Sequence, residues 1–346
     1  MKRLTALAIL LLSLHVQAQN IAIGNVTLTE GNTGTLNLDF PITVNPVSAS
    51  VITLSYSTTA GSATAGTDFV SVSGTSVSIP AGSANAIARV AINGDVTVET
   101  LETLTATISN ASSGTIVTNQ GLGQITDNDS ATLSIASVSQ AEGNTGSSPM
   151  AFIATLSNPV QGNVRITVAS SDGSATAGSD YVALPATVVS FAPLSTTQAV
   201  PVTINGDTQV EADESFTLAL SALELPVGIS TITAINAAIT GTVLNDDRAA
   251  LTISDVSGPE GSNGATTRFS FNVGLQGSSA LPLSVNFSTR NGTAIATQDY
   301  TATSGSLTFA PGESVKTILV TINADNNVEN PETFEVVLSD PSPNLD

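Results

Sequence analysis

The stretch Ile204-Asn-Gly-Asp-Thr-Gln-Val-Glu-Ala-Asp-Glu214 closes an apolar run that begins at Ala199. Related stretches occur twice more, as Ile92-Asn-Gly-Asp-Val-Thr-Val-Glu-Thr-Leu-Glu102 and Ile322-Asn-Ala-Asp-Asn-Asn-Val-Glu-Asn-Pro-Glu332. All three keep one acid, a second acid four positions later and a third after three more, while the residues between them change. Because an apolar run of this kind is typical of a strand, the chain carries the same acidic loop after the same strand three times.

Three further landmarks recur in a fixed order around these loops. A Glu-Gly pair comes first, at Glu30-Gly31, Glu142-Gly143 and Glu260-Gly261. A loop that ends in an acid and an aromatic residue comes second, at Asp68-Phe69, Asp180-Tyr181 and Asp299-Tyr300. A closing acidic segment ends the first two copies, as Ile125-Thr-Asp127-Asn-Asp129 and Val243-Leu-Asn-Asp246-Asp247. The spacing of these landmarks is that of whole domains and exceeds the ~20–50 residues of solenoid repeats.

Composition and patterning predict an all-β fold. Hydrophobic residues make up 41% of the chain and charged residues only 10%, and Thr, Ser, Val, Ile and Gly are favoured over helix formers. In the first copy, alternation and turn residues predict seven strands, at residues 21–29, 36–44, 51–57, 69–79 with a break at Gly74, 87–92, 104–108 and 121–125. We therefore expect three tandem seven-stranded antiparallel β-sandwiches, the third lacking its last strand, with domains at residues 19–129, 130–247 and 248–346.

The charge balance limits the classes of partner. Twenty-eight acids against 8 bases give a net charge of −20. Nucleic acids and anionic membrane surfaces attract clusters of Lys and Arg, which this chain lacks, so we expect neither as a partner. The chain has no cysteine, so its stability must come from core burial or bound metal rather than from disulfides.

The N-terminus reads as a secretory signal peptide over residues 1–18. Lys2-Arg3 precede an apolar run from Leu4 to Leu14, and Val16-Gln17-Ala18 form a small-residue cleavage site. This apolar run is shorter than the ~20 residues that a membrane-spanning helix needs, and no later segment could span a bilayer as a helix. The sequence therefore predicts a secreted or cell-surface protein.

The acidic landmarks are expected to meet at one end of each domain. In an antiparallel sandwich whose chain runs alternately up and down, the first, third, fifth and seventh strands end at the same pole. Each acidic landmark follows one of these strands. Twenty of the 28 acidic residues belong to the landmarks, whereas a chain with a merely acidic surface would scatter them.

The candidate metal ligands are therefore carboxylates alone. Copy one contributes Glu30, Asp68, Asp95, Glu99, Glu102, Asp127 and Asp129. Copy two contributes Glu142, Asp180, Asp207, Glu211, Asp213, Glu214, Asp246 and Asp247. Copy three contributes Glu260, Asp299, Asp325, Glu329 and Glu332.

So many carboxylates at one pole repel one another: a pair ~4 Å apart costs about 4 kcal/mol at an effective dielectric constant of ~20. A bound cation would offset that repulsion. Oxygen ligands without His or Cys suit Ca²⁺, which takes about 6–8 oxygens, better than Mg²⁺, which keeps more of its water. We expect Ca²⁺ as the cofactor, with more than one ion in each complete domain.

Three other functions are alternatives to calcium binding. The acids could instead form a salt-adapted surface, and the domains could be calcium-independent spacers in the stalk of a larger surface protein. Paired carboxylates also serve glycosidases, but the single histidine, His15, lies in the signal peptide, and neither a G-x-S-x-G nor a phosphate-loop motif is present. We therefore expect a non-enzymatic protein.

The landmarks together resemble tandem Calx-β domains, the calcium-binding modules of sodium/calcium exchangers that also occur in integrin beta-4 and in bacterial surface proteins. The resemblance implies seven-stranded immunoglobulin-like sandwiches whose distal loops bind several Ca²⁺ ions. We expect Ca²⁺ at these loops to stabilise the domains and stiffen their junctions, in a protein of adhesion or cell communication with a surface protein or cell-surface ligand as partner. It also implies that the acids of copies one and two are ligands. Two departures stand out: the third copy lacks the closing acids and should bind calcium least well, and Arg248 could compete for Asp246 and Asp247 as an ion-pair partner.

Overall fold

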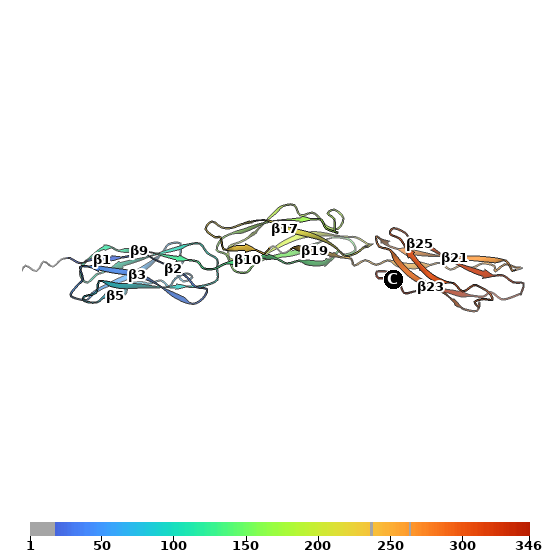
Figure 1. Cartoon of the computed structure of the whole chain (residues 1–346), viewed down its shortest axis with the longest axis horizontal. Helices are drawn as coiled ribbons and strands as arrows, with labels where there is room; N and C mark the ends of the chain where they lie inside the picture. Colours follow the sequence, from blue (N-terminus) through green and yellow to red (C-terminus); the bar gives the residue numbers. More distant parts are fainter. Residues whose placement is uncertain (1–17, 236–237, 263) are drawn as a thin grey trace, which may run out of the picture.

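The computed structural model describes residues 18–235, 238–262 and 264–346 and shows three β-modules placed end to end (Figure 1). Nearly all of the predicted signal peptide, residues 1–17, lies outside the described residues. Among the described residues there is no helix long and apolar enough to cross a membrane. The chain is all-β, with immunoglobulin-like sandwiches in tandem.

Domain 1 consists of two facing sheets, with strand orders β6-β3-β1-β8 and β2-β9-β7-β4-β5. The first strand is divided between the sheets, because β1 pairs with β3 whereas β2 pairs with β9. The strands are β1 (Asn20–Ile23), β2 (Val26–Thr29), β3 (Thr35–Asn45), β4 (Ile52–Ala60), β5 (Thr75–Ile79), β6 (Asn85–Asn93), β7 (Glu102–Ser109), β8 (Thr115–Thr118) and β9 (Gln120–Thr126).

Domain 2 repeats this arrangement, with sheets β15-β12-β10-β18 and β11-β19-β17-β13-β14. Its strands are β10 (Ala131–Ile135), β11 (Val138–Ala141), β12 (Gly146–Leu156), β13 (Val164–Ser171), β14 (Thr187–Phe191), β15 (Thr197–Gly206), β16 (Gln209–Val210), β17 (Glu214–Glu224), β18 (Ile232–Ala234) and β19 (Ile239–Leu244). The short strand β16 belongs to neither sheet and pairs instead with β22 of the next domain.

Domain 3 has two smaller sheets, β20-β21-β25 and β24-β23-β26. Near its C-terminal end Leu345 is buried and bridges Ala249 in parallel, as β8 pairs with β1 and β18 with β10. Within the described part of this domain, no strand pairs with the outer edge of β26. The strands are β20 (Ala250–Ile253), β21 (Thr266–Gln276), β22 (Ser278–Ser279), β23 (Leu283–Asn291), β24 (Ser304–Phe309), β25 (Val315–Asn323) and β26 (Phe334–Ser339).

The strands predicted for the first copy differ from the structure in three places. The predicted strand over residues 69–79 is wrong in its first half: Phe69 makes only isolated bridges, and β5 begins at Thr75 after a turn at Gly74, whose φ is 62°. The predicted first strand is split at Gly24-Asn25, and β8 was not predicted. Hydrogen bonding to two different sheets, which a sequence pattern does not record, causes the split.

Alternate residues of facing strands form each core. Along β3 the buried residues are Leu38, Phe40, Ile42 and Val44. The aromatic residue after each loop acid is a core residue: Tyr181 stacks on Phe216 with ring centroids 4.3 Å apart, and Tyr300 stacks on Phe334 at 4.4 Å. The loop acids are therefore attached to aromatic residues held in the core.

The joint between domains 1 and 2 is formed by the loop between β6 and β7. Val98 in this loop is fully buried, and its side chain packs in the core of domain 2. The backbone N–H of Val98 donates to the carbonyl of Pro159 (2.9 Å), and Gln161 N–H donates to the carbonyl of Val98 (3.0 Å). The joint is therefore a small β-ladder with an apolar side chain inserted across it.

The joint between domains 2 and 3 uses the same device. Val210 in β16 is fully buried in the core of domain 3, and β16 pairs in parallel with β22. The backbone N–H of Ala280 donates to the carbonyl of Val210 (2.9 Å). Each of the first two domains thus contributes one valine to the core of its successor.

Replacing Val98 by alanine should loosen the first joint. The substitution leaves a cavity in the core of domain 2 and should lower the free energy of unfolding of that domain by roughly 2 kcal/mol. We expect earlier proteolysis of the segment between domains 1 and 2 and a broader distance distribution in X-ray scattering. Val96→Ala, a change at an exposed position in the same loop, is the matched control and should behave like the wild type.

Candidate metal centre

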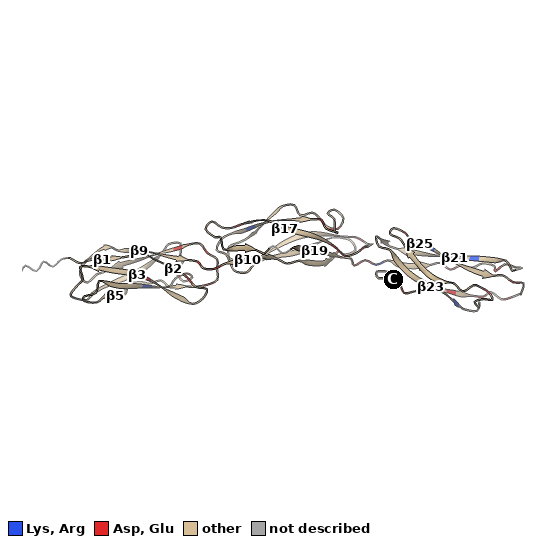
Figure 2. Cartoon of the chain, in the orientation of Figure 1, with Lys and Arg blue, Asp and Glu red and all other residues tan. Residues whose placement is uncertain are grey.

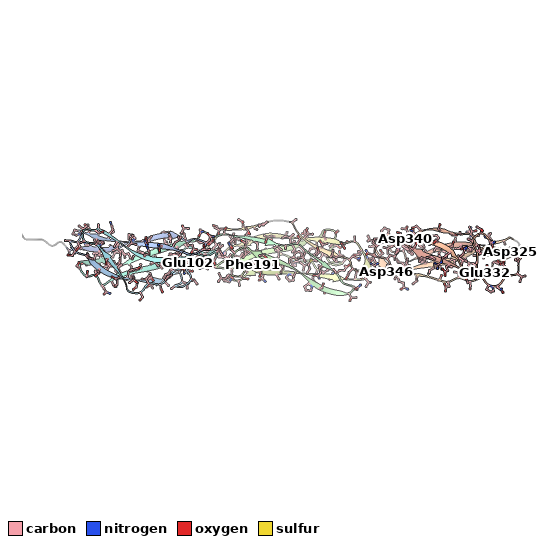
Figure 3. The ribbon with its side chains drawn as sticks, turned by 90° about the horizontal axis from the view of Figure 1, so that it is seen from below. Glu102, Phe191, Asp325, Glu332, Asp340 and Asp346 are labelled. Atoms are coloured by element: carbon pink, nitrogen blue, oxygen red, sulfur yellow. The ribbon has the colours of Figure 1, made fainter. Side chains whose placement is uncertain are left out.

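Two groups of carboxylates lie at the end of domain 1 that faces domain 2. One consists of Glu30, Asp127 and Asp129, and the other of Asp68, Glu99 and Glu102. In each group the three residues offer one oxygen apiece, and these oxygens all lie within 4.8 Å of one another. Figure 2 shows acidic segments near the joints of the rod, and Figure 3 shows Glu102 close to the end of domain 1. The structure brings six of the seven predicted acids of domain 1 into these two groups, at one pole of the domain.

Asp95, the seventh acid, lies between the groups. It is exposed, and its Oδ1 accepts a hydrogen bond from Thr97 N–H (2.6 Å), which fixes the start of the loop. Its charge contributes to the raised pKa values of Glu30 and Glu99, which belong to different groups. Asp95 therefore acts electrostatically on both groups at once.

The loop that carries Asp68 is tied to the end of β6. The backbone N–H of Asn93 donates to the carbonyl of Asp68 (2.9 Å), and the Asn93 side-chain amide donates to the carbonyl of Thr67 (2.6 Å). Asp68 Oδ2 accepts from Thr64 N–H (2.5 Å), which leaves its Oδ1 for another partner. The asparagine in each acidic stretch thus holds the loop acid in place, since the backbone N–H groups of Asn205 and Asn323 donate in the same way to the carbonyls of Asp180 and Asp299.

Several of these carboxylates are buried without enough partners. Glu102 and Asp129 are each only 2% exposed, and Glu102 Oε2 and Asp129 Oδ2 lie buried with no hydrogen-bond donor among the described residues. In domain 2, Asp247 Oδ2 is in the same condition. A buried ionised oxygen without a donor or a cation is destabilising, so these three atoms mark places where a ligand is needed.

Burial and mutual repulsion raise the pKa values of the glutamates. Burial, followed by the charges of neighbouring acids, raises the pKa of Glu30 to about 7 and that of Glu99 to about 8, from an ordinary value of 4.5. Burial likewise raises the pKa of Glu102 to about 7, although a hydrogen bond from Gln161 opposes the shift. Near neutral pH these groups are therefore partly protonated, and a metal ion that binds them must displace the protons.

Domain 2 presents the equivalent pair of groups. They are Glu142, Asp246 and Asp247, and Asp180, Glu211 and Glu214. Burial is the main cause that raises the pKa values of Glu142 and Glu214 to about 7. Asp207 repeats the role of Asp95: its Oδ1 accepts from Gln209 N–H (2.7 Å), and its charge raises the pKa of Glu142.

Domain 3 has a single group within its described residues, formed by Asp299, Glu329 and Glu332. Both glutamates of this group are exposed, and burial and neighbouring charges raise their pKa values without a large shift. The charge of Glu260 helps to raise the pKa values of both glutamates, and that of Asp325 helps to raise the pKa of Glu329. Neither Glu260 nor Asp325 belongs to a group. Figure 3 places Asp325 and Glu332 toward the far end of the domain.

A cavity of about 550 Å³ adjoins this third group, lined among others by Phe269, Ile322 and Phe334. In domain 1 the residues equivalent to Phe269 and Phe334 are Leu38 and Leu104, and Gly123 of β9 packs so closely on both that a methyl group there would touch them. The cavity in domain 3 therefore lies where β9 covers the sandwich in domain 1.

The sequence pattern missed several polar residues of the site. Asn245 occupies the place of Asp127: Asp127 Oδ2 accepts from Glu99 N–H (2.9 Å), and Asn245 Oδ1 accepts from Glu211 N–H (3.0 Å). In the closing segment of domain 2 an asparagine side chain therefore takes the place of one carboxylate, while Asp246 and Asp247 both belong to the group of Glu142. Asp213 lies outside both groups, is exposed, and accepts a hydrogen bond from Asn245 N–H (3.1 Å).

Two asparagines in the Glu-Gly turns were also missed, although their repetition in Glu-Gly-Asn-Thr-Gly is visible in the sequence. The Asn32 amide donates to Asp129 Oδ1 (2.5 Å), and the Asn144 amide donates to Asp247 Oδ1 (2.5 Å). Each supports one oxygen of an aspartate whose other oxygen has no partner among the described residues.

Gln161 enters the site of domain 1 from domain 2. Its Nε2 donates to Glu102 Oε1 (2.9 Å), and its Oε1 accepts from the Thr100 hydroxyl (3.2 Å). No repeat pattern indicates such a contact, because the equivalent residue in domain 3 is Ala280. A cavity of about 190 Å³ lined by Glu99, Asp127 and residues 228–231 lies at the same joint.

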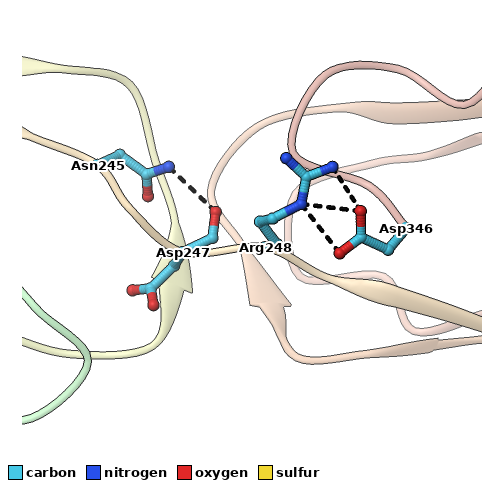
Figure 4. Close-up of polar contacts among 4 residues, drawn as sticks. All are labelled: Asn245, Asp247, Arg248 and Asp346. Carbon is cyan, nitrogen blue, oxygen red and sulfur yellow. Dashed lines mark hydrogen bonds and ion pairs between the residues drawn. The ribbon is translucent and has the colours of Figure 1, made fainter.

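The expected competition from Arg248 is not what the structure shows. Arg248 Nε donates to Asp346 Oδ1 at 2.8 Å, so this cation pairs with the C-terminal residue, at the end of domain 3 next to the joint, rather than with Asp246 or Asp247 (Figures 3 and 4). The side chain of Asn245 instead donates to the backbone carbonyl of Asp247 (3.2 Å), which shapes the closing segment. Among the described residues, neither Asp246 nor Asp247 forms an ion pair.

Glycine at position 94 allows the Glu-Gly turn to approach the acidic loop. A Cβ at Gly94 would lie 1.8 Å from the carbonyl oxygen of Gly31, and one at Gly206 would lie 2.0 Å from that of Gly143. Domain 3 has Ala324 in this place, and there Glu260 joins no group. The glycine of the Ile-Asn-Gly-Asp stretch is thus required for the closeness of Glu30 and Glu142 to the other acids.

The donor set fits calcium. Oxygens bound to one Ca²⁺ at ~2.3–2.6 Å lie within about 5.2 Å of one another, which the groups satisfy. All ligands are oxygens, several are buried, and none of the five ion pairs in the described chain involves a residue of these groups. Glu30, Asp127 and Asp129 could hold one ion, and Asp68, Glu99 and Glu102 another, with Asp95 between them.

The fold and the acids define a tandem of immunoglobulin-like sandwiches with acidic joints. A family profile of the Calx-beta domain matches residues 32–139, 127–247 and 261–346. The chain belongs to the Calx-beta domain family. No curated protein matches the chain.

Solved structures with detectable similarity include exchanger domains. One, CBD12 from CALX1.2, is 18% identical over 65% of this chain and 99% of that one, with a TM-score of 0.31. Another, the calcium binding domain CBD12 of CALX1.1, is 21% identical over 60% of this chain and 79% of that one, with a TM-score of 0.29. At these scores the similarity says nothing about the ligands of this chain.

The raised pKa values predict how stability depends on pH without metal. Between pH 4.5, where an unfolded glutamate titrates, and about pH 7 to 8, the folded chain holds protons that the unfolded chain releases. The free energy of unfolding should therefore fall as pH rises from 5.5 to 8.5. Thermal melts in a chelator at both pH values measure this. Saturating calcium should weaken or reverse this fall of stability with pH, because the metal replaces the protons. If the chain in chelator were more stable at pH 8.5 than at pH 5.5, the raised pKa values of these glutamates would be contradicted.

Gly94→Ala should weaken the Glu30 group selectively. The new methyl group must push the Glu-Gly turn away, which separates Glu30 from the loop acids. We expect calcium titration calorimetry to show the loss or weakening of binding in domain 1 with domain 2 unchanged. Gly31→Ala is the control in the same turn, because a Cβ there meets nothing closer than 3.8 Å. Equal calcium binding by the two variants would disprove the role of the close approach.

Proposed function

We propose that the chain is a calcium-binding, non-enzymatic array of extracellular modules, in which ions at the domain ends stabilise each domain and stiffen its joint with the next. The observation that carries the proposal is the set of three buried carboxylate oxygens that have no donor in the described part of the chain, Glu102 Oε2, Asp129 Oδ2 and Asp247 Oδ2. A calcium-independent spacer would gain nothing from burying unpaired charge, whereas a calcium site needs oxygens that no other group satisfies.

Calcium bound in domain 1 would act directly on the joint. The loop of residues 95–102 carries Asp95, Glu99 and Glu102, and it also carries Val98, which is packed in the core of domain 2. An ion that fixes the acids of this loop therefore fixes the valine as well. Because Gln161 of domain 2 donates to Glu102, both domains contribute to the surroundings of the same carboxylate.

The proposed setting is outside the cell, at the cell surface or in the medium. The N-terminal residues resemble a secretory signal peptide, and extracellular modules typically bind calcium with dissociation constants of about 10⁻⁴–10⁻³ M, which suits the calcium concentration there. A stiff rod that holds its ends apart fits a role in adhesion or cell communication, with another surface protein or a cell-surface ligand as partner.

Thermal melts with and without calcium test the proposal. A ligand that binds only the folded chain at about 100 times its dissociation constant adds about 2.7 kcal/mol to the free energy of unfolding. We expect the melting temperature to rise in millimolar calcium and the scattering profile to become that of a stiffer rod. Identical melts and identical profiles in calcium and in chelator would favour the spacer function.

Glu102→Gln tests two expected effects of the buried charge: lower stability without metal, and stabilisation by calcium. The amide keeps the shape of the side chain but removes the charge, so at pH 8 the metal-free variant should be more stable than the wild type, and its stabilisation by calcium should be smaller. Paired melts in chelator and in calcium measure both effects. Asp255→Asn, at an exposed acid outside every group, is the control and should change neither.

A further inference from the structure

The two connections of domain 2 are the points at which a pull along the rod acts on it. The chain enters the domain at β10, directly after domain 1, and leaves it after β19, directly before domain 3. The strands run along the long axis of the rod (Figure 1). Tension along the rod therefore draws β10 and β11 toward domain 1 and draws β19 toward domain 3.

The strands β11 and β19 are neighbours in one sheet and run in parallel. Val138–Ala141 pair in register with residues 241–244. Because tension draws the two strands in opposite directions along their common axis, the hydrogen bonds between them are loaded together rather than one after another. This parallel ladder is therefore the element that resists the sliding of one end of the domain past the other.

One group of acids lies across the end of this ladder. Glu142 directly follows β11, whereas Asp246 and Asp247 follow β19, and oxygens of the three lie within 4.8 Å of one another. We call these three residues the Glu142 group. When β11 slides past β19, Glu142 must move away from both aspartates, so the group lies between the two strands that tension separates.

Hydrogen bonds already join the two sides of the ladder at this point. Glu142 N–H donates to the carbonyl of Leu244 (3.2 Å), and Gly143 N–H donates to Asp246 Oδ1 (3.0 Å). Asp247 Oδ2 is buried and has no donor among the described residues. This oxygen therefore needs a cation or a proton, at the very place where the two strands end.

Domain 1 has the same arrangement. Its strands β2 and β9 pair in parallel; Glu30 directly follows β2, and Asp127 and Asp129 follow β9, and these three residues are the Glu30 group. Glu30 N–H donates to the carbonyl of Thr126 (3.1 Å), and Asp129 Oδ2 is buried without a donor in the described chain. Because Asp127 and Asp129 lie between β9 and β10, they are also part of the covalent connection to domain 2.

The second group of domain 2 is placed differently. Asp180 and Glu211 lie in the loops that follow β13 and β15, and Glu214 is the first residue of β17. None of these strands is the first or the last of the domain, so tension at the chain connections reaches them only through their neighbours. The two groups of one domain should therefore contribute differently to its resistance to tension.

We propose that the Glu142 group and the Glu30 group bear load: a calcium ion held there ties together the ends of the two strands that tension slides apart. Oxygens from both strands on one cation replace mutual repulsion by attraction, and sliding must break those bonds. The chain is then a tether whose resistance to tension along the rod is set by the calcium around it. This inference rests on the proposed calcium binding and adds a function to it, because stabilisation alone has no direction.

Single-molecule stretching tests the direction, and handles can be attached at chosen positions because the natural chain has no cysteine. Ser130→Cys and Ala250→Cys, at exposed positions on either side of domain 2, allow an axial pull on the chain of residues 19–346. At constant force, the lifetime of domain 2 should be at least about tenfold longer in millimolar calcium than in chelator, because the added bonds break on the way to unfolding.

Ala151→Cys and Val188→Cys give the control direction. Both positions are exposed and lie on the outer faces of opposite sheets, in β12 and β14. A pull between them separates the sheets, whereas β11 and β19 belong to one sheet and are not drawn past each other. Calcium should lengthen the lifetime much less in this direction. Equal lengthening in both directions would indicate general stabilisation only and would overturn the proposal.

Glu142→Gln and Glu214→Gln are matched variants, because each removes one charge from one group of domain 2. Titration calorimetry should show weaker calcium binding for both. In the axial pull, Glu142→Gln should lose most of the calcium-dependent gain in lifetime, and Glu214→Gln should keep most of it. An equal or larger loss in Glu214→Gln would show that the Glu142 group does not bear the load.

Melting and calorimetry separate load bearing from calcium binding itself. Calcium binding with a raised melting temperature, but without a longer lifetime in the axial pull, would contradict load bearing and leave the proposed calcium binding standing. A chain that shows no calcium binding in calorimetry would contradict both.

Discussion

The crowding of carboxylates at the domain ends is the constraint from which the rest of the structure follows. Glu30, Asp68, Glu102 and Asp129 are all buried in one small region of domain 1, and the five ion pairs of the described chain involve other residues. Their repulsion and lost hydration must be offset either by protons, which the raised pKa values of Glu30, Glu102 and Asp129 indicate, or by a cation. Stability, pH dependence and metal binding are therefore one linked equilibrium in this protein.

In each joint, a single loop carries both the acidic residues and the valine that packs in the next domain. Residues 95–102 hold Asp95, Val98 and two acids of one group, Glu99 and Glu102. The loop after β15 holds Asp207, Val210 and Glu211 in the same order. Because ligand and joint residues are only one position apart, the loop cannot move at one without moving at the other. Coupling between the metal centre and the joint needs no long pathway, since it lies within four residues of backbone.

Much of the site could be predicted from sequence, because strand parity assigns loop ends to poles without knowledge of the packing. That reasoning grouped Glu30 with Asp127 although they are far apart in the chain. It failed where the answer depends on contacts between domains or on neutral side chains: Gln161 reaches Glu102 only through the joint, and Asn245 was not a candidate because only carboxylates were considered as ligands. The split first strand and the inserted valines likewise depend on tertiary pairing, which alternation along one segment does not report.

In domain 3 the carboxylates are less crowded, and the comparison shows which features cause the crowding in domains 1 and 2. Ala324 replaces the glycine that lets the Glu-Gly turn approach, and Glu329 and Glu332 are exposed to water. Within its described residues this domain has no buried carboxylate oxygen lacking a partner, in contrast to Asp129 and Asp247 of the others. Its exposed glutamates can remain hydrated and charged without a cation, so the repulsion that a cation would offset is greater in domains 1 and 2 than in domain 3.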